Sequence, residues 1–305
     1  MLQRLRQILS PEYFGRPVAT AVPMLWLLLF FLVPFLIVLK ISFSEVLMAM
    51  PPYAPMIEWT RDRMLAIKLH LANYHFLFTD ALYLDSFLYS LKVAAVSTFL
   101  CLLLGYPMAL AIARAESTRR SVLLMLVILP FWTSFLLRIY AWIGLLKDDG
   151  LINNLLLHLH LIHAPIQMAN TSFAVYIGIV YSYLPFMILP LYANLEKHDS
   201  TLLEAAADLG AAPWKAFVRV TLPLSVPGVV AGAMLVFIPA VGEYVIPTLL
   251  GSANQLMIGR VLSDEFFENR DWPVASAVAI VILIVLLGPI VIFQRFRSRE
   301  LGAEA

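Results

Sequence analysis

The chain alternates between long apolar stretches and shorter polar ones. A helix needs about 20 predominantly apolar residues to cross the hydrocarbon core of a bilayer. Six stretches meet this requirement: residues 20–42, 86–113, 121–146, 171–193, 224–246 and 273–294. The pattern therefore predicts an all-α polytopic membrane protein with six transmembrane helices.

Composition supports this class. Of the 305 residues, 61% are hydrophobic and 13% are charged, against about 45–50% and about 25% in soluble domains. The net charge of +1 gives no general case for nucleic-acid binding, so we expect no nucleic-acid partner. The single Cys101 lies inside an apolar stretch, which excludes a disulfide framework. The first apolar stretch is longer than the about 7–15 apolar residues of a signal peptide, so we expect a retained first helix.

The distribution of positive charge predicts the orientation of the chain. Three of the 21 Lys and Arg residues lie in each of the segments 1–19, 114–120, 194–223 and 295–305. The alternate segments 43–85, 147–170 and 247–272 hold six between them. Because cytoplasmic loops of membrane proteins carry the excess of Lys and Arg, we expect both termini and residues 194–223 in the cytoplasm.

A polar stretch between the fourth and fifth apolar stretches has the pattern of a helical hairpin. Thr201 and Glu204 have the spacing of a capping box at a helix start. Gly210 is expected to end this helix, and Pro213 suits the first turn of a second one. Such a hairpin could dock into a groove on another protein, or it could be a solvated linker between two spans; the physical argument leaves both open.

The same stretch resembles the cytoplasmic EAA loop of the inner-membrane permeases of bacterial ABC importers. That pattern is E-A-A, three residues, G, nine residues, I, one residue and L-P. Its positions here are Glu204, Ala205, Ala206, Gly210, Leu222 and Pro223, with Val220 in place of Ile. The resemblance implies a coupling helix that seats in an ATPase subunit, with Glu204 on the ATPase surface and the small residues permitting a close fit.

Further runs resemble the polyamine (putrescine/spermidine) permeases of that family, and the putrescine-type members most of all. These runs are residues 128–134, 138–142, 174–181, 234–247, 257–262 and 269–276. The resemblance implies a type I, MetI-like permease in a bacterial inner membrane. Its expected parts are a cytoplasmic segment 1–19, a first helix and periplasmic loop 20–85, a five-helix core 86–294 containing the coupling loop 194–223, and a cytoplasmic tail 295–305.

The resemblance also implies partners. They are a second homologous permease subunit, which would make a heterodimer, two copies of a cytoplasmic ATPase and a periplasmic polyamine-binding protein. ATP and Mg would bind to the ATPase, and we expect no cofactor on this chain. The sequence contains no G-x-x-x-x-G-K-[ST], H-E-x-x-H or G-x-S-x-G pattern, so it predicts a non-catalytic subunit.

Glu243 is the main candidate for the substrate pathway, because a charged residue within a membrane span is costly and is by default a functional hypothesis. Prolines and glycines between residues 237 and 247 predict an interrupted helix that exposes backbone carbonyls. Glu243 and the neighbouring ring of Tyr244 would suit an ammonium group. The alternative is a structural ion pair with Arg138, which lies about as deep in the third stretch. The two readings are compatible, since such a pair could also act as a gate.

Aromatic residues in the spans are further pathway candidates, although each could equally serve packing or anchor a helix at the membrane interface. They are Trp132, Tyr140, Trp142, Tyr181 and Tyr183. Outside the spans, His158, His160 and His163 do not share one helical face and match no standard zinc spacing, so we expect no metal site. Their alternation with leucines fits an interfacial amphipathic helix.

Three rival functions remain at this stage. An ABC importer for another small solute would keep the coupling loop and change the pathway. A channel or carrier working without an ATPase would leave that loop unexplained. A membrane enzyme would need a catalytic cluster, and the sequence shows none. The acidic segment 247–272 could contact a soluble partner or guide a cation, or it could be a plain solvated loop.

Overall fold

The computed structural model describes residues 20–59 and 65–303. It is built mainly from helices, with one short antiparallel ribbon. The chain divides into two compact units, which are described separately. The first comprises Met1–Leu77 and Glu265–Val281, and the second comprises Phe78–Asp264 and Ile282–Ala305.

In the first unit, a helix from Thr20 to Ser42 includes the π-helical turn η1 (Leu28–Leu32) and α3 (Val33–Ser42). The segment that follows holds β1 (Ile57–Trp59), β2 (Leu65–Ile67) and α4 (Ala72–Thr79). The buried Asn73 donates to the carbonyls of Ser42 and Ser44, each at 2.9 Å. This amide therefore fixes the end of the first helix.

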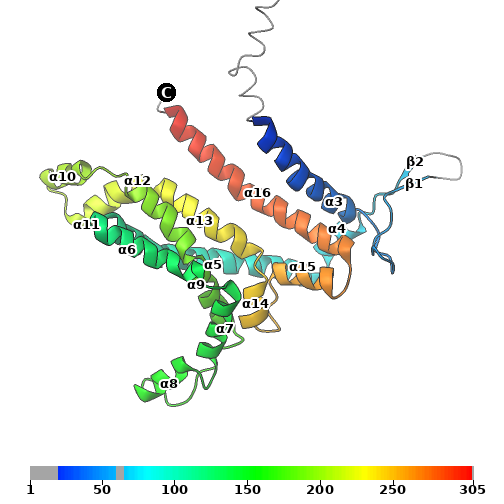
Figure 1. Cartoon of the computed structure of the whole chain (residues 1–305), viewed down its shortest axis with the longest axis horizontal. Helices are drawn as coiled ribbons and strands as arrows, with labels where there is room; N and C mark the ends of the chain where they lie inside the picture. Colours follow the sequence, from blue (N-terminus) through cyan, green and yellow to red (C-terminus); the bar gives the residue numbers. More distant parts are fainter. Residues whose placement is uncertain (1–19, 60–64, 304–305) are drawn as a thin grey trace, which may run out of the picture. The chain divides into compact units, whose positions relative to one another are not determined.

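The second unit is centred on α5 (Ala81–Ala113), α9 (Ser172–Leu195) and α13 (Val226–Val241), which pack against one another (Figure 1). Two buried apolar clusters lie among them. A Cβ on Gly232 would lie 2.8 Å from the sulfur of Met187 and 3.0 Å from its carbonyl oxygen. The missing side chain thus permits the close approach of α13 to α9.

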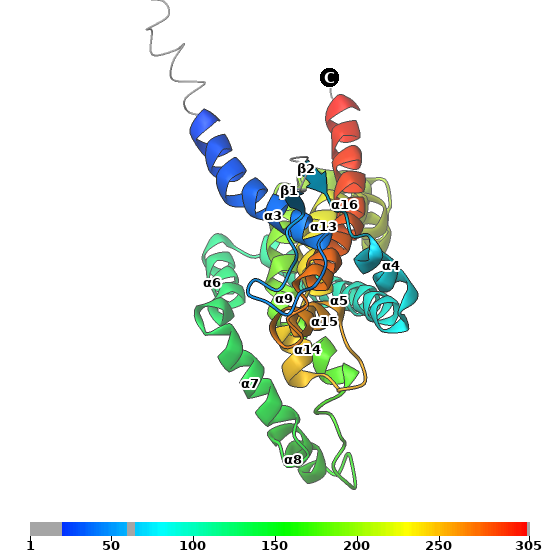
Figure 2. The same ribbon diagram turned by 90° about the vertical axis from the view of Figure 1, so that its right-hand side faces the viewer.

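The third apolar stretch is not the single helix expected over residues 121–146. It consists of α6 (Ser117–Ile128), the 3-10 turn η2 (Leu129–Trp132) and α7 (Phe135–Leu146), followed by α8 (Leu151–His158). The axis bends by 89° between the two halves. Figure 1 shows α6 and α7 running in different directions, and Figure 2 shows α7 leading on to α8. Pro130 cannot donate to the helix, and Thr133 is extended at φ −90° and ψ 151°, so the helical ladder stops there.

The expected hairpin is present. It consists of α10 (Thr201–Asp208), α11 (Pro213–Ala216), the π-helical turn η3 (Phe217–Thr221) and α12 (Leu222–Leu224). The predicted capping box is not formed, because Thr201 is already helical and its amide donates to the Asp199 side chain at 2.9 Å. Asp199, two residues before the helix, does the capping that we expected from Thr201.

The predicted interruption around Glu243 is confirmed. α13 ends at Val241 and α14 (Val245–Leu250) begins four residues later. The rest of segment 247–272 is not a plain solvated loop, since it contains the whole of α15 (Ile258–Phe267), and Ile258 and Val261 are buried. α16 then runs from Trp272 to Ala303, so it includes most of the expected tail 295–305.

Among the described residues, four helices are long and apolar enough to cross a membrane. The number rises to six if each of two bent helix pairs counts as one crossing. These pairs are Ser117–Trp132 with Phe135–His158 and Pro213–Leu224 with Val226–Val241. The all-α, polytopic fold class expected from the apolar pattern is therefore confirmed.

Candidate functional site

Glu243 lies at the break between α13 and α14 and is only 8% exposed. Its Oε1 accepts hydrogen bonds from the backbone amides of Val245 at 3.0 Å and Ile246 at 3.3 Å. The first amides of a helix have no partner within the helix and carry its partial positive charge. The carboxylate therefore caps α14 and holds the broken segment in place.

The second oxygen of Glu243 is bound from another helix. The hydroxyl of Tyr183, in α9, donates to Oε2 at 2.5 Å. A carboxylate has about four acceptor positions, and groups in the described part of the chain donate to three of them. Of the predicted aromatic residues, Tyr183 is thus brought into direct contact with the predicted acidic residue.

The start of α15 lies against the same break. A Cβ on Gly259 would lie 2.8 Å from the backbone oxygen of Glu243 and closer still to that of Gly242. The amide of Ile258 donates to the buried hydroxyl of Ser90, in α5, at 2.7 Å. Sequence reasoning did not identify Gly259 or Ser90. A glycine next to an expected loop was the available signal for a close backbone approach.

Arg138 does not pair with Glu243 in this structure. Its guanidinium lies over the rings of Phe131 and Phe135, 5.4 and 5.7 Å from their centroids. Its Nε and Nη1 are buried and have no hydrogen-bond partner in the described part of the chain. The alternative hypothesis was a structural ion pair between Glu243 and Arg138. Glu243 does have a structural role, but its partners are Tyr183 and backbone amides. A gate that forms this ion pair in another conformation stays a prediction.

The other predicted aromatic residues do not gather around Glu243 in the same way. Trp132 is 78% exposed, and Tyr140 and Tyr244 are also exposed. Trp142 and Tyr181 contact each other edge to face, with ring centroids 5.5 Å apart. A role for these five residues in the substrate pathway stays a prediction. The exposed rings of Trp132, Tyr140 and Tyr244 are equally suited to contact with lipid or with a partner chain.

Most motif residues of the helical hairpin α10–α12 are exposed at its surface. Glu204 and Ala205 are exposed, as are Leu222 and Pro223, while Ala206 is half-buried. Larger apolar side chains are exposed on the same hairpin: Leu209 at 89% and Trp214 at 65%. Gly210 has φ +77°, and a Cβ there would meet nothing within 4 Å. The glycine is therefore required by the backbone turn, and the space around it is open to a partner.

A polar contact that sequence reasoning missed lies at the other end of α5 and α9. The hydroxyl of Tyr89 is 3.2 Å from Ser172 Oγ and 3.1 Å from Gln255 Oε1. Ser172 Oγ also donates to Gln255 Oε1. This contact fastens the loop after α14 to the ends of two core helices. Nothing in the spacing of these three residues pointed to it.

No group of three or more His, Cys, Asp or Glu side chains gathers to hold a metal ion in the parts that the structure describes. His158 ends α8, and His160 lies just beyond it with φ +53°. Asn153 closes this loop, since its side chain donates to the carbonyls of Lys147 and Ile166 and accepts from the Ile166 amide.

The described structure is thus a bundle of apolar helices with a break at the buried Glu243 and an exposed helical hairpin between two of them. The sequence profile of the family described as binding-protein-dependent transport system inner membrane component matches residues 102–296, and the chain belongs to this family. That match covers the core, from the middle of α5 into α16.

Similar proteins extend the match to most of the chain. A protein of Haemophilus influenzae, the spermidine/putrescine transport system permease protein PotB, is 41% identical over 286 residues, covering 93% of this chain and 94% of its own length. The Escherichia coli K12 protein of the same name is 41% identical over 263 residues, covering 86% and 90%. In fold, the chain is similar to a bacterial ABC transporter that imports alginate, with a TM-score of 0.67, 19% identity and coverage of 96% and 99%.

Proposed function

We propose that this chain is one permease subunit of an ATP-driven importer that takes up a polyamine, with putrescine as the first candidate and spermidine as the second. The observation that carries the proposal is the 41% identity, over 93% of the chain, to a spermidine/putrescine permease. The importer class rests also on the family match over residues 102–296.

The geometry around Glu243 supports a cationic substrate. A polyamine presents ammonium groups, which need negative charge and hydrogen-bond acceptors when they leave water. The break between α13 and α14 offers a carboxylate and backbone carbonyls no longer paired within a helix. Because Glu243 is 8% exposed, its contact with substrate requires the break to open. Opening would exchange the bonds to Tyr183 and to the α14 amides for bonds to an ammonium group.

The proposed partners lie on both sides of the membrane and beside this chain within it. A periplasmic binding protein would deliver the polyamine to the outer side, and two ATPase copies would bind ATP and Mg in the cytoplasm. A second permease chain would complete the cavity. The hairpin 201–223 would receive the movement of the ATPase, with Glu204 on the contact surface. Its exposed Leu209 and Trp214 support this role, because exposed apolar patches mark interaction sites.

The test is uptake of labelled putrescine and spermidine by proteoliposomes that contain this chain, its partner permease, the ATPase and the binding protein. Native protein is compared with Glu243→Gln, and Glu45→Gln serves as a control at an exposed acidic residue. We expect ATP-dependent uptake that Glu243→Gln loses and Glu45→Gln retains. ATPase activity should persist in both variants.

Other outcomes separate the rival functions. Uptake that needs no ATP would indicate a channel or carrier. ATP hydrolysis stimulated by a binding protein, without uptake of either polyamine, would indicate an importer for another solute. Full uptake by Glu243→Gln would remove this carboxylate from the mechanism and leave the family assignment intact.

A further inference from the structure

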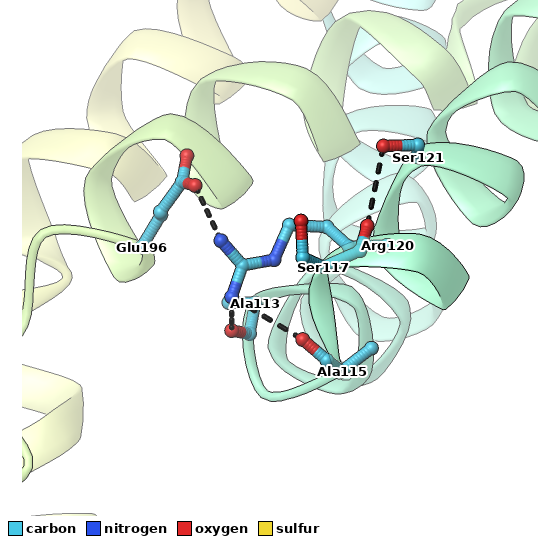
Figure 3. A network of polar contacts seen from close by, with 6 residues as sticks. All are labelled: Ala113, Ala115, Ser117, Arg120, Ser121 and Glu196. Carbon is cyan, nitrogen blue, oxygen red and sulfur yellow. Dashed lines mark hydrogen bonds and ion pairs between the residues drawn. The ribbon is translucent and has the colours of Figure 1, made fainter.

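Arg120 joins three helix ends on the side of the coupling hairpin (Figure 3). Its Nη1 binds Glu196 Oε1 at 2.6 Å, and Glu196 is the residue directly after α9. Its Nη2 donates to the carbonyls of Ala113 and Ala115 at 3.2 Å, at the end of α5 and just beyond it. Arg120 itself lies in the first turn of α6, so one guanidinium contacts the ends of α5, α6 and α9.

The chemistry of this contact suits a link between rigid elements. The carbonyls at a helix C-terminus are unpaired and carry partial negative charge, so a guanidinium there is favourable. The pKa of Glu196 is lowered by a hydrogen bond from Tyr192 and by Arg120, which keeps its carboxylate charged. The side chains of Arg120 and Glu196 are 30% and 40% exposed. Ion pairs with this much exposure to solvent add little to the free energy of folding. The Arg120–Glu196 pair therefore matters for the relative position of the ends of α5, α6 and α9 rather than for stability.

The segment held by Arg120 leads directly into the coupling helix. Only residues 197–200 separate Glu196 from α10. Within this segment, the ring of His198 lies within hydrogen-bond distance of the Leu224 carbonyl, at 3.2 Å. After the hairpin, the chain is tied to α5 a second time, because Tyr106 and Ser225 are joined by a hydrogen bond of 2.9 Å between their hydroxyls. Both arms of the hairpin are therefore attached to the core by polar contacts.

The hairpin is not packed solidly onto the helices beneath it. A cavity of about 240 Å³ lies between the end of α5, the 195–203 segment and residues 220–224. Ala113 and Glu196, two of the partners of Arg120, line it. The cavity removes part of the apolar contact beneath the hairpin, so the polar ties supplement the packing of Phe217 against Tyr106 in holding the hairpin to the core.

We propose that Arg120 is a positioning residue for energy coupling, which transmits the movement of the hairpin through Glu196 to α5 and α6. The inference rests on the proposed function, since it assumes that the hairpin contacts an ATPase. With the guanidinium absent, the hairpin could move against the cavity while α5 and α6 stay in place. ATP would then be hydrolysed without transport.

The experiment compares Arg120→Gln with native protein in the complete reconstituted complex and measures uptake and ATP hydrolysis together. We expect the number of solute molecules imported per ATP to fall by at least about fivefold, which is the smallest factor typical of coupling between two sites. Arg119→Gln is the matched control, because Arg119 lies one residue earlier, is 79% exposed and forms a loose 3.8 Å ion pair with the equally exposed Glu116. It should retain the native ratio.

Further variants keep the test independent of folding defects. Arg120→Lys retains a charge but cannot bridge Glu196 and two carbonyls equally well, so an intermediate ratio is expected. Glu196→Gln should lower the ratio in the same direction. The inference would be overturned if Arg120→Gln kept the native ratio of transport to hydrolysis, or if it lost uptake and hydrolysis equally. Polyamine transport by the unmutated complex would still support the proposed function in either case. A native complex that neither hydrolyses ATP nor transports a polyamine would overturn both.

Discussion

Tyr183 donates a hydrogen bond of 2.5 Å to the buried carboxylate of Glu243, and so joins the middle of α9 to the break between α13 and α14. The two residues are separated by 60 positions in the sequence. Their contact means that groups of this chain bind and stabilise the buried carboxylate of Glu243. Any substrate that binds Glu243 has to compete with a phenol and two backbone amides.

Removing the Tyr183 hydroxyl should destabilise the protein. Tyr183→Phe keeps the ring and deletes a hydrogen bond to a charged, buried acceptor, so we expect a loss of about 1.5–3 kcal/mol in the free energy of unfolding. Denaturant titration of the detergent-solubilised protein measures it. Tyr181→Phe, which retains its ring contact with Trp142, is the control and should change stability much less. Equal effects of the two substitutions would contradict a special role for the Tyr183 hydroxyl.

Adding a methyl group at Gly259 should disrupt the break. In Gly259→Ala the new Cβ would approach the backbone oxygens of Gly242 and Glu243 to less than a normal contact distance. Backbone atoms cannot move aside as a flexible side chain does, so we expect a cost of about 1–3 kcal/mol and reduced uptake. Thermal unfolding and transport assays check this. Gly144→Ala, where a Cβ meets nothing within 4 Å, should remain native-like, and a harmless Gly259→Ala would refute the close approach.

Replacing Gly210 should affect coupling more than membrane insertion. At φ +77° an L-residue costs about 1–2 kcal/mol, and the β-branched Gly210→Val adds bulk on the exposed face of the hairpin. We expect ATP-dependent uptake to fall while the amount of inserted protein is unchanged. Gly210→Asn should be milder, because Asn tolerates the left-handed region. Full ATP-dependent uptake by Gly210→Val would count against the coupling role of the hairpin.

Acid should weaken the tie between α9 and α6. Hydrogen bonding from Tyr192 and the charge of Arg120 hold the pKa of Glu196 below its ordinary value of 4.5. A carboxylate with a lowered pKa stabilises the folded state above that ordinary value, and this contribution disappears as the pH falls through the folded pKa. We therefore expect the difference in melting temperature between native protein and Glu196→Gln to shrink below pH 4.5. A difference that is independent of pH would exclude an ionised Glu196 as its cause.

The sequence determined the features that depend on local chemistry. Runs of about 20 apolar residues gave the membrane class, because a spanning helix needs that length. Gly210 and Pro213 gave the hairpin, since a glycine accepts a positive φ and a proline suits a first turn. The break at Glu243 followed from its neighbouring glycine and prolines. Each of these inferences uses residues a few positions apart.

The tertiary structure alone decided which distant side chains meet. Glu243 and Arg138 were both expected near the same depth, yet Glu243 is bound by Tyr183 and by the amides that its own break leaves free. Pro130 marks where the helix after α6 is interrupted, but only the structure shows that the two halves meet at 89°. The bond from Arg120 to Glu196 spans 76 positions. Such contacts depend on helix rotation and tilt, which are set by packing among residues far apart in the chain rather than by local periodicity.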